Sequence, residues 1–202
     1  MKKLAKDALV IDVECGRTNY SALSLSKYNI IGVDISRNEL LKAIKLNREM
    51  NFVMADANYL PFRHEIADVI MCIAVLGSPR INLKRFAFWA REILKSNGYI
   101  IIVASLKNAC NIFDPAILLR KWRSFKIREI TKIFSRFRIL LILRFGIISS
   151  YIFDLFILII IKVFNKISKR ELFLAYFPLL DKLFEAKIVD RNARYFLVVL
   201  QK

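Results

Sequence analysis

The start of the chain constrains its fold more than any other stretch. An apolar segment at residues 9–13 contains Asp12, a turn follows at Gly16, and a second apolar segment at 30–34 ends in Asp34. At the end of the first strand the backbone must turn sharply and let a ligand approach, which favours glycine, and the second acid can accept the hydroxyls of a ribose. The pattern predicts the first βαβ unit of a nucleotide-binding α/β fold.

Alternating strand and helix patterns continue through the first half of the chain. Further apolar segments cover residues 51–56, 67–73 and 99–103. Ser36 and Glu39 form a predicted capping box before one helix, and a second helix is predicted over 82–95, where Asn97 and Gly98 give a left-handed stop. The carboxyl ends of parallel strands meet at one edge of a sheet, where open α/β folds bind ligands. The side chains expected at or near that edge are Asp12, Asp34, Asp56 and Cys72.

Residues 108–170 do not continue the alternation of strands and helices. Between Arg120 and Arg144 there are nine basic residues and one acid, interleaved with aromatic and aliphatic side chains. Such a stretch is typical of a solvated amphipathic helix, an RNA-binding surface, or an interfacial helix among lipid head groups. The apolar run at 145–161 favours the lipid interpretation. Because Asp154 interrupts this run, a pair of helices that caps the substrate side of the sheet is favoured over a membrane span. The residues expected to bind a polyanion are Arg120, Lys121, Arg123 and Lys126.

The end of the chain returns to α/β character. A helix is predicted over 171–185, and strands over 186–190 and 195–200 are joined by a short polar turn, which is typical of an antiparallel hairpin at a sheet edge. The predicted fold class is α/β, with a mostly parallel sheet of about seven strands and a helical insertion between the fifth and the sixth. The predicted division is a core over 1–107, the insertion over 108–170, and 171–202 completing the core.

Net charge, cysteine spacing and the number of histidines indicate which partners and which cellular compartment to expect. The formal net charge of +17 favours a polyanionic partner, either nucleic acid or an anionic membrane surface. Cys15, Cys72 and Cys110 are widely spaced, which indicates reduced thiols in a cytoplasmic protein, with peripheral membrane association as the alternative. His64 is the single histidine, so no metal site is expected. The residues before the first strand are too few and too polar for a secretory signal.

Four motifs together resemble the class I methyltransferases that use S-adenosylmethionine. They lie at residues 10–16, 32–34, 55–62 and 91–98. The resemblance implies a Rossmann-like class I methyltransferase fold with S-adenosylmethionine as cofactor. The residues that it assigns to the cofactor are Asp12, Gly16, Asp34, Ile35, Asp56, Ala57 and Cys72.

The resemblance also implies a role for most of these residues. Asp12 and Gly16 are expected to hold the methionine part of the cofactor, and Asp34 to bind the ribose hydroxyls. The residues expected at the adenine are Asp56 and Ala57, and Cys72 is expected to line the methyl-transfer site. No general base is assigned, because methyl transfer from a sulfonium is an in-line displacement that depends mainly on orientation and on a site with little water.

Within the superfamily, three stretches resemble the tRNA wobble-uridine carboxymethyl methyltransferases. They are residues 12–20, 72–76 and 195–199, and they imply tRNA as the methyl acceptor. Quinone and lipid methyltransferases share most of the same motifs, so a hydrophobic acceptor is the alternative.

Two departures from the family pattern support a third interpretation. Glu14 and Thr18 stand where the family has glycine, so side chains occupy positions where backbone meets the cofactor, and Glu14 adds a negative charge near the carboxylate of the cofactor. Two histidines that follow the fourth strand in the tRNA enzymes are Gly77 and Ser78 here. These changes are also compatible with a non-catalytic methyltransferase-like subunit that binds RNA, a membrane or a protein partner.

Overall fold

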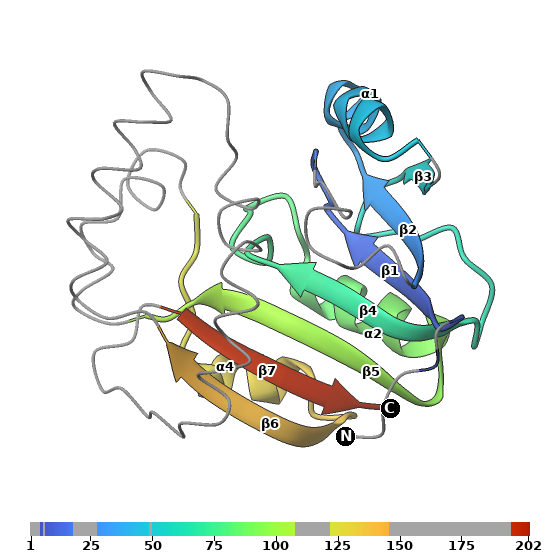
Figure 1. Ribbon diagram of the computed structural model, residues 1–202. Coiled ribbons are helices and arrows are strands. Elements are labelled where there is room, and N and C mark those ends of the chain that lie inside the picture. The colour runs from blue at the N-terminus through green and yellow to red at the C-terminus, as the bar shows by residue number, and fades with distance from the viewer. Residues whose placement is uncertain (1–4, 6, 18–27, 49, 108–121, 146–194) are drawn as a thin grey trace.

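The computed structural model describes residues 5, 7–17, 28–48, 50–107, 122–145 and 195–202. Within them the chain forms a seven-stranded sheet flanked by helices (Figure 1). The strands are β1 (Leu9–Val13), β2 (Asn29–Asp34), β3 (Asn51–Met54), β4 (Ala67–Ile73), β5 (Leu94–Ser105), β6 (Arg138–Phe145) and β7 (Tyr195–Gln201). The helices are α1 (Arg37–Leu46), α2 (Leu83–Ile93) and α4 (Ile127–Ile133). The strand order across the sheet is β3-β2-β1-β4-β5-β7-β6, which confirms the predicted α/β fold class.

Five neighbouring strands, from β3 to β5, run parallel. All of β4 except Asp68 is buried, and β1 is buried from Val10 to Val13. Near-continuous burial is the pattern of parallel strands that are covered on both faces. The predicted strands at 9–13 and 67–73 are therefore confirmed with the same bounds.

Polar side chains set the start of α1 and α2. The Ser36 hydroxyl accepts a hydrogen bond from the Glu39 backbone N–H (3.4 Å), as the predicted capping box requires of its first half. The Asn82 side-chain oxygen accepts from the N–H groups of Lys84 (3.1 Å) and Arg85 (3.2 Å). Both helices therefore begin where the sequence predicts them.

The end of α2 differs from the prediction. The helix ends at Ile93 rather than at residue 95, because Leu94 already pairs with Ala67 of β4. Regular pairing resumes at Tyr99, only two residues further along β4, so residues 95–98 bulge out of the sheet. Asn97 is left-handed, with φ 67°, but it turns the strand rather than ending the helix.

The sixth strand lies earlier in the chain than predicted. β7 runs antiparallel between β5 and β6, and β6 lies within the range 108–170 that was predicted to be a helical insertion. The prediction that 195–200 forms a hairpin at the sheet edge is wrong, because β7 has a strand on each side. Of the other C-terminal predictions, the helix at 171–185 and the strand at 186–190 lie outside the described residues.

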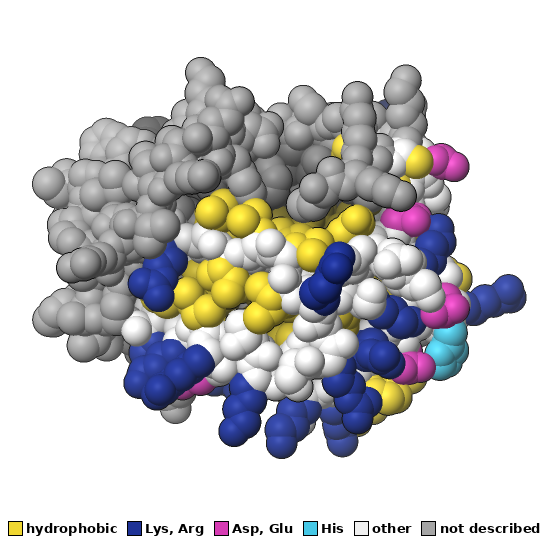
Figure 2. All heavy atoms as spheres, turned by 90° about the horizontal axis from the view of Figure 1, so that it is seen from below, with side chains coloured by type: hydrophobic (Ala, Val, Ile, Leu, Met, Phe, Trp, Pro, Cys, Tyr) yellow, Lys and Arg dark blue, Asp and Glu magenta, His cyan; other side chains and the backbone are white. Residues whose placement is uncertain are grey.

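An extra residue in β6 explains why sequence pattern missed this strand. Ile139 pairs with Leu200 and Leu141 with Val199, so Leu140 is an additional residue in a bulge. The bulge breaks the alternation by which strands are recognised. At this outer edge Ile139 and Ile142 are exposed, and Figure 2 shows apolar side chains there with basic ones around them.

Two helices cover one face of the sheet (Figure 1). α2 and α4 lie on the same side of β4, β5 and β7, and the rings of Phe86 and Phe134 meet edge to face with their centroids 6.2 Å apart. Ile130 of α4 is fully buried in the same core. In the described part of the chain no helix has the length and apolarity needed to cross a membrane. The apolar run at 145–161 lies almost wholly outside the described residues.

Candidate active site

The carboxyl ends of β1, β2, β3 and β4 lie at one edge of the sheet. Backbone hydrogen bonds continue the sheet beyond the strands, from Cys15 N–H to the Val33 carbonyl (2.8 Å) and from Ala55 N–H to the Asp34 carbonyl (3.1 Å). A third runs from Ala74 N–H, after β4, to a carbonyl of β5. These bonds hold the turns after the strands in line with one another, so the segments that carry the predicted site residues share a rim.

Asp34 joins two of these turns. One carboxylate oxygen accepts a hydrogen bond from the Gly16 backbone N–H (2.7 Å), and the other accepts from the Ser36 N–H (2.8 Å). The side chain is 6% exposed, so these bonds are made largely away from water. The structure therefore brings the predicted ribose residue and the predicted glycine turn into direct contact. Each carboxylate oxygen keeps lone-pair capacity for a further donor.

The turns after the two central strands adopt left-handed backbone conformations. Glu14 follows β1 with φ 57°, and Ala74 follows β4 with φ 56°. Residues other than glycine rarely adopt this region, and such backbone strain is frequent at functional sites. Gly16 is also left-handed, with φ 55°, and a Cβ atom there would find no atom within 4 Å. The backbone angle thus favours glycine at this position, and among the described residues the space beside it is open.

The predicted adenine residues form a tight turn after β3. One oxygen of Asp56 accepts hydrogen bonds from the backbone N–H and the side-chain amide of Asn58, both at 2.8 Å. Ala57 between them is buried, whereas Ile35 at the end of β2 is 45% exposed. Asp56 and Ile35 therefore lie at the rim on neighbouring strands.

Asn58 is a site residue that sequence reasoning did not single out. Its side-chain oxygen accepts from the Asn82 N–H (2.7 Å), and its amide donates to the Arg80 carbonyl (3.0 Å). The side chain thereby ties the turn after β3 to the loop between β4 and α2. The signal in the sequence was the Asp-x-Asn spacing, which is typical of a side chain that closes a local turn.

Asp12 and Cys72 lie deeper than the other predicted residues. Each is the second-last residue of its strand, β1 and β4, and both are fully buried. Cys15, in the glycine turn, is a buried thiol as well. The structure thus gathers Gly16, Asp34, Ile35 and Asp56 at the rim and leaves Asp12 and Cys72 beneath it.

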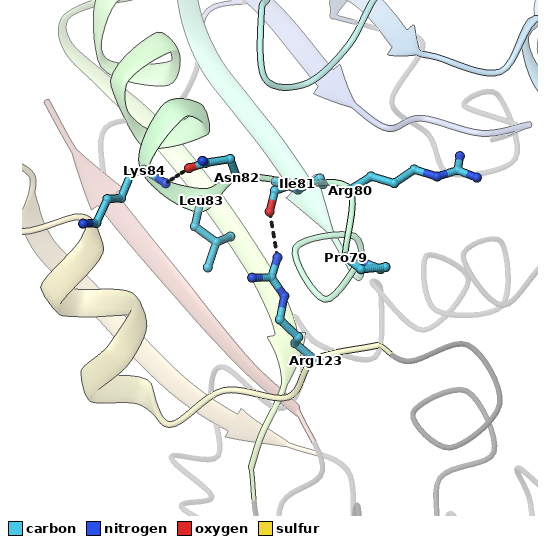
Figure 3. A pocket seen from close by; sticks show the side chains of 7 residues that line it. All are labelled: Pro79, Arg80, Ile81, Asn82, Leu83, Lys84 and Arg123. Carbon is cyan, nitrogen blue, oxygen red and sulfur yellow. Dashed lines mark hydrogen bonds between the residues drawn. The ribbon is translucent and has the colours of Figure 1, made fainter.

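An open pocket of about 430 Å³ lies beside the rim (Figure 3). It is lined by the β4–α2 loop, the first residues of α2, and Arg123. The Arg123 guanidinium donates to the carbonyls of Ser78 (3.0 Å) and Ile81 (2.7 Å), while Arg80 and Lys84 point away from it on opposite sides. The pocket therefore does not focus three cations on one point.

The same arginine fastens the segment before α4 to the β4–α2 loop. The Arg123 N–H donates to the Gly77 carbonyl (2.8 Å), and a Cβ at Gly77 would lie 2.7 Å from the Arg123 carbonyl oxygen. Of the predicted polyanion-binding residues, Arg123 and Lys126 are exposed, and Arg120 and Lys121 lie outside the described residues. The hydrogen bonds of Arg123 have a structural purpose, and its contact with a polyanion stays a prediction.

Comparison with known proteins agrees with this geometry. Residues 11–102 match the family described as "Methyltransferase domain". The structure is similar to that of a phosphoethanolamine N-methyltransferase of Haemonchus contortus in complex with S-adenosyl-L-methionine. The TM-score is 0.69 and the identity 16%, and the match covers 100% of this chain and 50% of that one. The fold is therefore that of the class I methyltransferases, as the sequence motifs predict.

Two curated proteins share sequence with part of the chain. An uncharacterised protein of Methanocaldococcus jannaschii is 34% identical over 128 residues, which is 62% of this chain and 54% of that protein. A tRNA (carboxymethyluridine(34)-5-O)-methyltransferase of Arabidopsis thaliana is 29% identical over 124 residues, which is 60% of this chain and 29% of that protein. The chain thus spans about half the length of the first relative and under a third of the second.

Proposed function

We propose that this chain, in which residues 11–102 carry a methyltransferase domain, binds S-adenosylmethionine at the carboxyl ends of β1 to β4 and transfers its methyl group to tRNA. The observation that carries the cofactor assignment is the pair of hydrogen bonds at Asp34, to the N–H groups of Gly16 and Ser36. They fix a buried carboxylate at the rim between the glycine turn and α1.

The residues at the rim fit the parts of this cofactor. Asp34 can accept the ribose hydroxyls, because each of its oxygens accepts one backbone hydrogen bond from the described residues and has capacity for another. Ile35 offers half-exposed apolar surface to the adenine, and Asp56 with Ala57 lies in the turn after the neighbouring strand β3. The open space beside Gly16 leaves room for the methionine part.

The chemistry is supplied by the cofactor, which when bound carries an electrophilic methyl group on a sulfonium. This chain's residues orient the two reactants and exclude water, which are the main contributions to an in-line displacement. Asn58 is a positioning residue in this proposal, because it joins the adenine side of the rim to the loop where the acceptor would enter.

Two observations support tRNA as the acceptor. One of the relatives is a tRNA methyltransferase by name, although only 29% of its length is matched. The net charge of +17 favours a polyanionic partner over a neutral quinone. A hydrophobic acceptor and a non-catalytic binding subunit are the outcomes that the experiment must separate from this one.

Titration calorimetry tests the cofactor assignment. We expect the wild type to bind S-adenosylmethionine, and Asp34→Asn to bind it at least about tenfold more weakly, because a hydrogen bond to a charged group contributes about 1.5–3 kcal/mol. Glu39→Gln is the matched control, because it removes the same charge from α1, outside the proposed cofactor site. Among the described contacts the Glu39 carboxylate pairs only with Lys42. Equal affinity of Asp34→Asn and the wild type would refute the assignment.

Transfer of a labelled methyl group then identifies the acceptor. Label that enters tRNA supports the proposal, and label that enters an isoprenoid quinone or lipid extract instead overturns the acceptor while retaining the enzyme. Cofactor binding with no transfer to either would favour the non-catalytic subunit.

A further inference from the structure

Two helices on one face of the sheet present a row of cations. α2 and α4 pack against each other through Phe86 and Phe134. Lys84 lies in the first turn of α2 and points outward on the side where α4 lies (Figure 3). Arg128 and Lys132 are one turn apart on the outer side of α4, and Arg136 follows that helix. We call these four exposed residues the α2–α4 face.

Among the described residues no acidic side chain forms an ion pair with these four cations. Ion pairs join Lys42 to Glu39, His64 to Glu92, Lys95 to Asp68, and Lys202 to Glu65, and Glu92, near the end of α2, is the only one of these acids on either helix. Glu129 is the single acid of α4, and its carboxylate accepts from the Lys126 backbone N–H (2.8 Å). Figure 2 shows Lys and Arg side chains gathered over α2 and α4, along the lower side of the view, with few acidic ones among them.

The outer surface of α4 is polar, whereas an exposed aromatic side chain stands on α2. The apolar residues of α4 face inward, where Ile130 is fully buried, so this helix has no apolar side to insert into a bilayer. Phe88 is one turn beyond Lys84 and is 54% exposed. Cations that can neutralise phosphates, next to an aromatic ring on which a base can stack, are typical of RNA-binding surfaces.

We infer that the α2–α4 face binds the phosphate backbone of RNA. The inference rests on the proposed function in taking RNA as the acceptor, and it adds where that RNA lies. The first turn of α2 borders the loop that Asn58 ties to the rim, so RNA on this face would pass next to the methyl-transfer site. None of the four cations belongs to the cofactor site.

Binding of in-vitro-transcribed tRNA, measured by fluorescence anisotropy over a range of salt concentrations without cofactor, tests the inference. The face variant replaces Lys84, Arg128, Lys132 and Arg136 with glutamine. The control replaces Arg37, Lys42, Lys45 and Arg48 with glutamine; these residues are also two lysines and two arginines, all exposed, on and just after α1 at the other end of the sheet. Both variants lower the net charge by the same amount.

We expect the face variant to bind tRNA at least tenfold more weakly and to reduce the log-log salt slope by about 3, since each phosphate contact contributes about 0.7–0.9 to it. The control should retain most of its affinity. Equal weakening in both variants would overturn the inference, because affinity would then follow net charge alone. Wild-type protein that binds phosphatidylglycerol vesicles but no tRNA would also overturn it, in favour of a membrane partner.

The two proposals fail separately. If the wild type binds tRNA through this face but does not bind S-adenosylmethionine, the face is retained and the methyltransferase proposal is lost. If the cofactor binds and the face variant still binds tRNA as the wild type does, the proposed function is retained and the α2–α4 face is not the RNA surface.

Discussion

The five parallel strands and the antiparallel pair differ in how they are built and in what they carry. From β3 to β5 all neighbouring strands run parallel, and their carboxyl ends bring the candidate cofactor residues to one rim. β6 and β7 are joined through Phe145 and Tyr195, which are far apart in the chain, and this end of the sheet carries α4 and most of the proposed RNA surface. The proposed cofactor site and most of the proposed RNA surface therefore lie in two regions, which mutations can alter separately.

Removing the ring that joins α4 to α2 should have the largest effect on stability. Phe134 is 1% exposed and contacts the rings of Phe86 and Phe137, so Phe134→Ala should lower the free energy of unfolding by about 3–5 kcal/mol. Urea denaturation measures this, with Phe88→Ala as the control at an exposed ring. A loss of under about 1 kcal/mol would mean that α4 is not held by this core.

A methyl group at the junction of the two regions should have the next largest effect. In Gly77→Ala the new Cβ would lie 2.7 Å from the Arg123 carbonyl oxygen and 3.1 Å from the Trp122 ring. We expect the segment before α4 to be displaced and stability to fall by about 1–3 kcal/mol in thermal or urea unfolding. Ser78→Ala, at the next position, should change little. Wild-type stability of Gly77→Ala would show that the two regions are not fastened there.

Glycine at position 14 tests the departure from the family pattern within the parallel region. Glu14→Gly removes a side chain held at φ 57° and a negative charge near the proposed methionine site, so S-adenosylmethionine affinity should rise up to about tenfold. Stability should change little, because relief of the left-handed backbone is offset by added entropy in the unfolded chain.

Comparison with Glu14→Gln in the same calorimetric titration separates the two causes. If the charge matters, Glu14→Gln should give most of the gain in affinity. Weaker binding by Glu14→Gly would show that Glu14 belongs to a rebuilt site and would favour the non-catalytic subunit. Thr18, the other departure, lies outside the described residues.

The smallest expected effect concerns a contact between the loop before β4 and the end of β7. The Lys202 ammonium donates to Glu65 (3.1 Å) and holds the pKa of that exposed carboxyl below its ordinary value of 4.5. A lowered pKa in the folded state stabilises the protein above the unfolded value, and the contribution is lost as pH falls through the lower folded value.

Glu65→Gln should therefore be slightly less stable than the wild type at pH about 7, and the difference should vanish at pH about 3. Urea midpoints at both pH values measure it. Lys202→Met also removes the bond from the ammonium to the Leu94 carbonyl, so it should lose more, but adding Glu65→Gln to it should cause no further loss. A difference that is independent of pH would exclude the ion pair as its cause.

The parallel region could be predicted because its information is local. Strands such as β4 are continuous apolar runs, and the helices begin at side chains such as Ser36 and Asn82 that cap their own first turns. β6 could not be predicted in this way, because the bulge at Leu140 disturbs the alternation of its side chains.

The candidate site was predictable in its residue types but not in its contacts. The strand-end acids and Gly16 followed from spacing, yet nothing in the sequence shows that Asp34 binds the Gly16 N–H or that Glu14 is left-handed. Arg123 shows the same limit, since the basic run predicts phosphate contacts but does not reveal that this guanidinium donates to two carbonyls of a neighbouring loop. Charge is visible in a sequence, but the partner of a charge depends on tertiary structure.

The position of β7 has a consequence for how the protein is made on the ribosome. β7 lies between β5 and β6 in the sheet although it follows both in the chain. Until residues 195–201 emerge, β5 and β6 each have an open edge of unpaired backbone groups, which is a template for wrong pairing with other chains. Nascent chains arrested before residue 195 should therefore be retained by chaperones more strongly than chains that extend beyond it.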